Sequence, residues 1–308
     1  MYTIYILPIL AYGLEVLLPD EVDLKPVASF HKKSIIQLCS LPDNVANPAP
    51  FILTGMLPLQ AIVHKKALKF LIALCRKDYS LERSIVERQA TLREKTSWVT
   101  RIIKLLIIYE LPPLHSLLEN LPGKVEWANQ VNRVVHTYWK YHLQKQAILY
   151  PSLRYLNVAE YTVGVPHPTL AAVGNNTTCT YKSMIKSRLL TGTYRLQTTK
   201  QAFNQQEVDT ICCLCKEEPE TRVHMLAVCP SLQPCRDRLN LTCPVEIPKD
   251  HEEYAQLLLD SSKRLQSHIT TNCSIKEMEH WGRRVCYALH AERATQMAKL
   301  PTRKRYGL

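Results

Sequence analysis

The sequence is poor in glycine, with only 8 glycines against 19 prolines in 308 residues. No glycine-rich phosphate-binding loop is present, so this class of nucleotide site is excluded. The prolines separate long stretches rich in leucine, isoleucine, lysine and arginine. Such stretches are typical of helices joined by loops. We therefore predict a mainly α fold that begins with a bundle-like helical body.

Adjacent aspartates are absent from the whole chain. Polymerases hold two catalytic metal ions with paired carboxylates, and reverse transcriptases place these in a Tyr-x-Asp-Asp turn. The sequence also has no recognisable nucleophile signature of the Ser/His/Asp type. The best candidate for a nuclease site, Lys249-Asp250 with Glu252 and Glu253, is too short and has no downstream partner. We therefore expect no enzymatic activity and no small-molecule substrate.

Acidic residues are fewer than basic ones: the chain has 39 lysines and arginines but 27 aspartates and glutamates, which gives a net charge of +12. This balance favours a polyanionic partner, nucleic acid before a membrane surface. A merely soluble basic protein explains the charge alone equally well. With 46% hydrophobic residues, the chain is long enough for two or three small cores.

The eleven cysteines follow no regular framework, and their number is odd. This pattern indicates a metal site in a reducing compartment, nuclear or cytoplasmic, and not a disulfide scaffold. The first 18 residues are almost wholly apolar, with Glu15 as the only charge. They lack a basic leading region and contain Pro8 and Gly13. We therefore expect a buried core segment and not a membrane anchor.

The strongest pattern in the chain is C-x2-C-x8-H-x4-C, formed by Cys212, Cys215, His224 and Cys229. Two cysteines two residues apart form a tight knuckle, and a histidine and a cysteine can close a tetrahedron with them. Zinc prefers four such ligands in a closed structural site. The competing explanation is chance clustering among many cysteines. Cys213 leaves an ambiguity of register, but the spacing favours Cys212 as the ligand.

A basic segment precedes this pattern and contains no acidic residue between Cys179 and Gln206. Its cations are Lys182, Lys186, Arg188, Arg195 and Lys200. A helix with an unopposed basic face is suited to hold a nucleic-acid backbone. We expect Lys216 and Arg222 to add phosphate contacts from the zinc module. Thr191-Gly192-Thr193-Tyr194 is expected to break or bend the helix.

Helical spacing of apolar residues predicts helices near residues 21–38, 60–76, 125–146, 181–198, 251–268 and 275–298. We divide the chain into a helical region (1–149), a proline- and glycine-containing linker (150–178), a basic helix with the zinc module (179–240), and C-terminal helices with a basic tail (241–308).

Several motifs resemble the part of non-LTR (LINE-type) retrotransposon reverse transcriptases that follows the polymerase core. The first half contains an apolar Pro…Tyr-Gly-Leu-Glu stretch (7–15), Phe30-His31-Lys32-Lys33, Leu41-Pro42 and Thr54-Gly55-Met56-Leu57-Pro58-Leu59. These are similar to the thumb and the helices beyond it. The second half contains Arg188-Leu189-Leu190-Thr191-Gly192, the two-cysteine knuckle, Glu220-Thr221 before His224, and Cys229-Pro230. This order is similar to the C-terminal zinc-binding region of the family, which usually has no cysteine at the position of Cys213.

The resemblance implies a non-catalytic C-terminal fragment that binds RNA or DNA, stabilised by a structural zinc ion. An alternative is a zinc-stabilised structural or protein-interaction module that does not bind nucleic acid. The acidic loop Glu217-Glu218-Pro219-Glu220 favours this alternative, because carboxylates beside the site repel phosphate.

Overall fold

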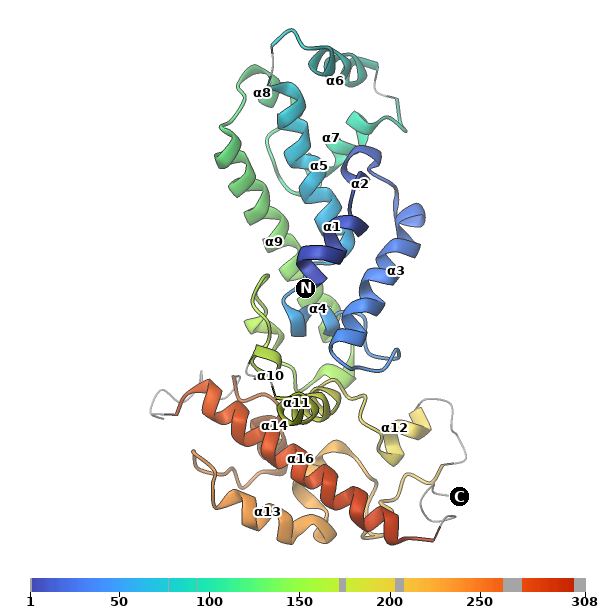
Figure 1. Ribbon diagram of the computed structural model, residues 1–308, viewed down its shortest axis with the longest axis vertical. Coiled ribbons are helices and arrows are strands. Elements are labelled where there is room, and N and C mark those ends of the chain that lie inside the picture. Colours follow the sequence, from blue (N-terminus) through green and yellow to red (C-terminus); the bar gives the residue numbers. More distant parts are fainter. Residues whose placement is uncertain are drawn as a thin grey trace. The chain divides into compact units, whose positions relative to one another are not determined.

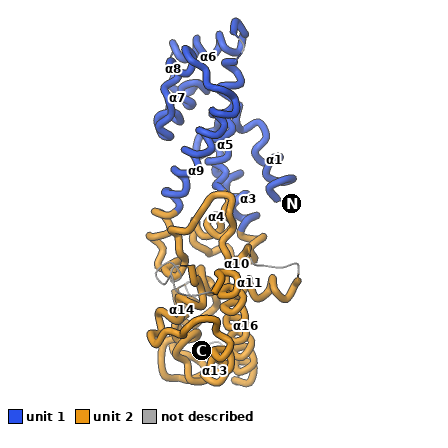
Figure 2. The backbone as a smooth tube through the Cα atoms, turned by 90° about the vertical axis from the view of Figure 1, so that its left-hand side faces the viewer, with its two compact units in different colours: residues 1–35, 57–143 blue, residues 36–56, 144–308 orange. Residues whose placement is uncertain are grey.

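The computed structural model describes residues 2–76, 78–92, 94–171, 176–202, 208–262 and 273–301 (Figure 1). Over these residues the protein is mainly helical, as predicted, and contains two isolated β-bridges but no sheet. The chain divides into two compact units (Figure 2). Unit 1 comprises residues 1–35 and 57–143, and unit 2 comprises residues 36–56 and 144–308.

Unit 1 is built around helix α5 (Leu59–Cys75), which packs against α2, α6 and α7. The hydroxyl of Ser97 caps α7 by accepting a hydrogen bond from the Thr100 amide at 3.2 Å. The buried Trp127 indole donates to the Leu68 carbonyl at 2.8 Å and joins α9 to α5. The other helices of the unit are η1 (Tyr2–Ile6), α1 (Leu7–Leu10), α2 (Leu14–Leu17), most of α3 (Glu21–Leu38), α6 (Leu81–Leu92), α7 (Trp98–Ile108), α8 (Leu114–Glu119) and most of α9 (Lys124–Ile148).

The apolar N-terminal segment is not a buried core segment, so that prediction is wrong. Of its described residues only Tyr2, Ala11 and Leu18 are buried. Gly13 adopts a left-handed conformation with φ of 73° and separates two four-residue helices. Helices this short direct few side chains toward one core, so the remaining apolar side chains are exposed or half-buried. None of the described helices is long and apolar enough to span a membrane.

Unit 2 is organised around α16 (Ile275–Lys299), which packs against α10, α11, α13 and α14. Its first turn has a capping box in which Ser274 and Glu277 satisfy each other's backbone amides. Gly282 permits the close packing of α16, because a Cβ there would lie 2.6 Å from the Leu258 carbonyl oxygen and 3.1 Å from Lys186 Nζ.

The other helices of unit 2 are short, apart from α11. They are α4 (Ala49–Thr54), η2 (Pro151–Leu153), η3 (Val158–Glu160), α10 (Pro168–Ala171), α11 (Thr177–Leu190), α12 (Gln197–Ala202), η4 (His224–Val228), η5 (Pro230–Leu232), α13 (Gln233–Asn240) and α14 (His251–Leu259). The predicted basic helix ends at Leu190, and a left-handed Gly192 with φ of 71° follows. This is the break that the Thr191–Tyr194 sequence predicted.

The predicted linker at 150–178 is an integral part of unit 2. The Gly164 amide donates to the Gly55 carbonyl and the His167 amide to the Leu53 carbonyl, each at 2.8 Å. These contacts bring the segment 36–56 into unit 2, a pairing that sequence order did not indicate. The helix predicted at 251–268 ends at Leu259, where Asp260 takes an extended conformation. Residues 263–268 of that prediction and the basic residues Arg303-Lys304-Arg305 lie outside the described residues.

Candidate metal centre

The structure brings Cys212, Cys215, His224 and Cys229 together. Their sulfur and nitrogen atoms all lie within 4.8 Å of one another, and the side chains are buried or half-buried. The Sγ atoms of Cys212 and Cys229 are 3.9 Å apart, and Cys215 Sγ lies 3.3 Å from His224 Nε2. These four residues could therefore hold one metal ion.

The first two ligands are placed by a tight backbone knuckle. The Lys216 amide donates to the Cys212 carbonyl at 3.0 Å, and Lys216 takes the left-handed conformation with φ of 67°. The Cys212 amide in turn donates to the Glu218 carbonyl at 2.8 Å. The chain thus folds back immediately after Cys215, which holds the two sulfurs on the same side.

The other two ligands lie at the ends of a single π-helical turn, η4. The Cys229 amide donates to the His224 carbonyl, five residues earlier, at 2.7 Å. The Thr221 hydroxyl accepts from the His224 amide at 3.1 Å and caps the start of the turn. The i to i+5 pattern explains why a histidine and a cysteine with four residues between them face one centre.

The histidine is oriented by a carboxylate. His224 Nδ1 lies 3.3 Å from Glu218 Oε2, which leaves Nε2 directed at the cysteines. A metal-binding histidine typically has such a partner on its other nitrogen, because the contact fixes the tautomer and the ring orientation. Glu218 was not among the predicted site residues. Its position in the loop between Cys215 and His224 could have indicated a carboxylate partner for the histidine.

Hydrogen bonds among the candidate ligand groups shift their pKa values. The hydrogen bond between Cys212 and Cys229 raises the pKa of Cys212 to about 12 and lowers the pKa of Cys229. A hydrogen bond with Cys212 raises the pKa of His224 to about 9. These groups must release their protons when they bind a metal ion, so metal affinity at this site would depend on pH.

Cys213 faces away from the other four groups. Its sulfur lies 2.7 Å from the Gln197 side-chain amide nitrogen, and the residue is 2% exposed. The group of converging ligand atoms contains Cys212 and not its neighbour. The register that the spacing favoured is therefore the one in the structure.

The half-buried Arg293 and the buried Arg236 support the module, and among the described residues only Arg293 has a carboxylate partner. Arg293 of α16 forms two hydrogen bonds with Glu220, at 2.7 and 3.0 Å, and Glu220 also accepts from the Gln197 amide. Arg236 donates to the carbonyl oxygen of the ligand Cys229 and to Gln233. No sequence signal marked Arg236 as part of the site, because only the fold places it beside Cys229.

The predicted basic face is wrong at Lys186. This side chain is 1% exposed, and its Nζ lies 2.7 Å from Glu279 Oε2 of α16. The segment itself has no acidic residue, but the opposing charge comes from a helix that lies far away in the sequence. Lys186 therefore holds two helices together and is not available to phosphate.

Arg188 and Arg222 are also engaged inside unit 2. Arg188 donates through Nε and Nη2 to the Ser40 carbonyl, at 3.0 and 2.9 Å. Arg222 donates to the carbonyls of Ser152, Leu189 and Leu190, and burial lowers its pKa to about 10. Its guanidinium also lies 4.7 Å from the Tyr155 ring centroid. Both arginines thus satisfy carbonyls instead of forming an open surface.

The remaining predicted cations are accessible. Arg195 and Lys216 are exposed, and Lys200 is half-buried. Lys182 is half-buried, with its Nζ 5.5 Å from the Tyr287 ring centroid. The structure therefore divides the five cations predicted in the basic segment into accessible side chains and side chains that maintain the fold.

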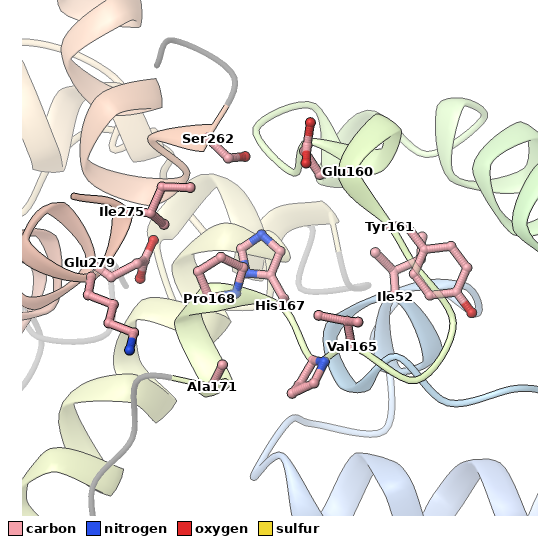
Figure 3. Close-up of a pocket in the computed structure, with 12 residues that line it drawn as sticks. Ile52, Glu160, Tyr161, Val165, His167, Pro168, Ala171, Ser262, Ile275 and Glu279 are labelled. Atoms are coloured by element: carbon pink, nitrogen blue, oxygen red, sulfur yellow. The ribbon is translucent and has the colours of Figure 1, made fainter. Parts of the chain in front are cut away.

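A cavity of about 340 Å³ lies elsewhere in unit 2, with His167, Ser262 and Glu279 in its wall (Figure 3). Both ring nitrogens of His167 are engaged, since Nε2 lies 3.1 Å from Asp260 Oδ2 and Nδ1 accepts from the Thr169 amide. The Ser262 hydroxyl donates to Asp260 and not to the histidine. This arrangement is a structural hydrogen-bond network without an activated nucleophile.

No family model matches the sequence, and neither the curated proteins nor the solved structures contain a match.

Proposed function

We propose that the chain is a non-catalytic nucleic-acid-binding fragment related to the C-terminal region of non-LTR retrotransposon reverse transcriptases. In this proposal a structural zinc ion stabilises the module at residues 210–236. The observation that carries it is the convergence of three sulfurs and one imidazole nitrogen within 4.8 Å.

Zinc fits this ligand set best. Thiolate and imidazole ligands suit zinc, and Zn–S bonds of about 2.3 Å at tetrahedral angles separate two sulfurs by about 3.8 Å. The distance of 3.9 Å between Cys212 and Cys229 agrees with that value. Four protein ligands leave no open position for water, so the ion's role is structural. Its binding energy would fold the ligand-bearing loop.

The neighbouring charges also suit a zinc centre with three thiolates. Such a centre has one net negative charge. Arg236 is 2% exposed, contacts the Cys229 carbonyl, and has no carboxylate within ion-pair distance among the described residues. A buried cation without a counter-ion is unfavourable, and a negatively charged centre beside it would offset that cost.

The residues that carry the family resemblance hold the module together, which supports the proposal. Arg188 binds the Ser40 carbonyl, and Glu220 joins α12 to α16 through Gln197 and Arg293. A Cβ on Gly192 would lie 2.9 Å from the Ser152 side chain. The motif is thus the set of contacts that builds one fold around the metal ligands.

We assign nucleic-acid contact to the accessible cations Lys182, Arg195, Lys200 and Lys216. Arg195 and Lys200 are electrostatic neighbours, which concentrates positive charge beside α12. Phosphate contacts by such side chains would make binding steeply dependent on salt. The absence of an Asp-Asp pair leads us to propose that no primer extension occurs.

The test is binding of labelled RNA and single-stranded DNA by the zinc-loaded protein across a salt series. The double substitution Arg195→Ala with Lys200→Ala should weaken the binding of both RNA and single-stranded DNA. It should also lower the slope of log affinity against log salt by roughly 1.4. Lys25→Ala with Lys33→Ala, two exposed lysines of α3, is the control with the same charge change. An unchanged slope in the Arg195/Lys200 variant with full zinc content would refute the assigned surface.

The second candidate function is a protein-interaction clip. Glu217 and Glu218 are exposed beside the ligands and would repel phosphate, although Glu220 is buried in its pair with Arg293. Binding of nucleic acid that is weak and insensitive to salt, together with full zinc content, would favour this candidate over the first.

A further inference from the structure

Unit 1 contains a second concentration of positive charge, between helices α5 and α9. Lys65 Nζ lies 3.5 Å from His136 Nε2, and Lys69 Nζ donates to Asn132 Oδ1 at 2.9 Å. Lys65 and Lys69 are one turn apart on α5, and Asn132 and His136 are one turn apart on α9. Four polar side chains thus form a short ladder across the two helices.

Among the described residues, no carboxylate pairs with the lysines of this cluster. Helix α5 contains no acidic residue, and α9 contains only Glu126, in its first turn. Glu15, on the helix packed against α5, pairs with Lys66. No carboxylate of the described residues lies within 4.0 Å of Lys65 or Lys69.

The cations are held in an unfavourable environment. All four side chains of the ladder are half-buried. Burial lowers the pKa of Lys65 and Lys69, and Lys69 lowers that of Lys65 further. Burial and then both lysines lower the pKa of His136. Desolvation and like-charge repulsion both act against protonation here, and an anion would relieve both.

We propose that Lys65 and Lys69, positioned by Asn132 and His136, form a phosphate-binding site. Ammonium groups that lie one turn apart without a carboxylate partner match the oxygens of a phosphoryl group. Arg133 and Lys140 lie on α9 at i, i+3 and i+7 spacing with His136, so the positive charge continues along one helix face. This extension suits the repeated phosphates of a polynucleotide. The site belongs to unit 1 and does not depend on the zinc module.

The experiment compares the full chain with Lys65→Gln/Lys69→Gln and with the control Lys25→Gln/Lys33→Gln. In the first arm, millimolar inorganic phosphate replaces chloride at equal ionic strength, and thermal unfolding is followed. We expect the midpoint of the parent and the control to rise and that of Lys65→Gln/Lys69→Gln to stay unchanged. An equal rise in all three proteins, or no rise in the parent, overturns the site.

The second arm measures affinity for a single-stranded oligonucleotide against salt. Loss of both lysines should weaken oligonucleotide binding by about tenfold and lower the slope of log affinity against log salt by roughly 1.4. This result would identify a polynucleotide as the source of the phosphate. An unchanged oligonucleotide affinity together with a lost phosphate effect identifies free phosphate instead. If the double variant is unstable, Lys69→Gln alone is used, with half the change in slope expected. If the proposed nucleic-acid surface of unit 2 is wrong, only the Arg195→Ala/Lys200→Ala protein would reveal it, through an unchanged salt slope.

Discussion

Lys186 of α11 and Glu279 of α16 form an ion pair with a distance of 2.7 Å in which each side chain is 1% exposed. The Thr169 hydroxyl donates to the same carboxylate oxygen at 3.3 Å. Gly282 lets the ammonium group approach α16, since a Cβ there would lie 3.1 Å from Nζ. The pair therefore fixes the helices that support the metal module.

Removing one partner of this pair should destabilise unit 2 strongly. Lys186→Met leaves a buried carboxylate without its cation, and we expect the free energy of unfolding to fall by about 3–5 kcal/mol. Lys186→Met with Glu279→Met removes both charges and should recover most of this loss. Denaturant unfolding of the three proteins measures the effect. A Lys186→Met protein as stable as the parent would show that this lysine is not buried as described.

Metal content should follow the geometry of the ligand group. Cys215→Ser and His224→Ala each remove one of four converging ligand atoms, so both proteins should lose zinc when purified. Cys213→Ser should retain about one zinc ion per chain, because Cys213 faces Gln197 instead. Elemental analysis of the purified proteins provides the measurement. Zinc loss in Cys213→Ser alone would place the ligand register one residue later.

Asp260 should make stability dependent on pH in the acid range. Burial raises its pKa, but hydrogen bonds from His167, Ser262 and the Asn157 amide outweigh this and lower it from 3.8 to about 2. A depressed carboxyl pKa stabilises the fold above the unfolded-state value, and the contribution is lost as pH falls from about 4 to about 2. The difference corresponds to about 2 kcal/mol.

Asp260→Asn should therefore flatten the dependence of unfolding free energy on pH between these values. The exposed Asp43→Asn is the matched control and should leave the curve unchanged. Denaturant unfolding at several pH values provides the curves. Curves of equal slope for the parent and Asp260→Asn would contradict the assigned role of this carboxylate.

Local patterns in the sequence were sufficient for the long helices and for the candidate ligand group. The spacing of apolar residues predicted α3, α5, α9 and α16 closely, because each of these helices is long. The knuckle and the η4 turn are also local, since each metal ligand is within 17 residues of the others. Backbone hydrogen bonds inside this short segment place the ligands without help from distant residues.

Burial of charge could not be predicted in the same way. Lys186 and Arg195 lie in one basic segment, yet one is 1% exposed and the other is exposed. Glu279 is 93 residues from Lys186, and Ser40 is 148 residues from Arg188. Such partners are brought together only when the helices pack, so a basic stretch in a sequence does not by itself predict a basic surface.

The sequence by itself thus determined the long helices, the break at Gly192 and the register of the four candidate metal ligands, because short-range geometry controls each of them. Tertiary structure alone decided which cations remain accessible, that residues 36–56 join unit 2, and that Arg236 lies beside Cys229. It also placed Lys65 and Lys69 opposite Asn132 and His136. These features depend on contacts between distant segments, and the energy of a charged side chain is set by the neighbours that packing provides.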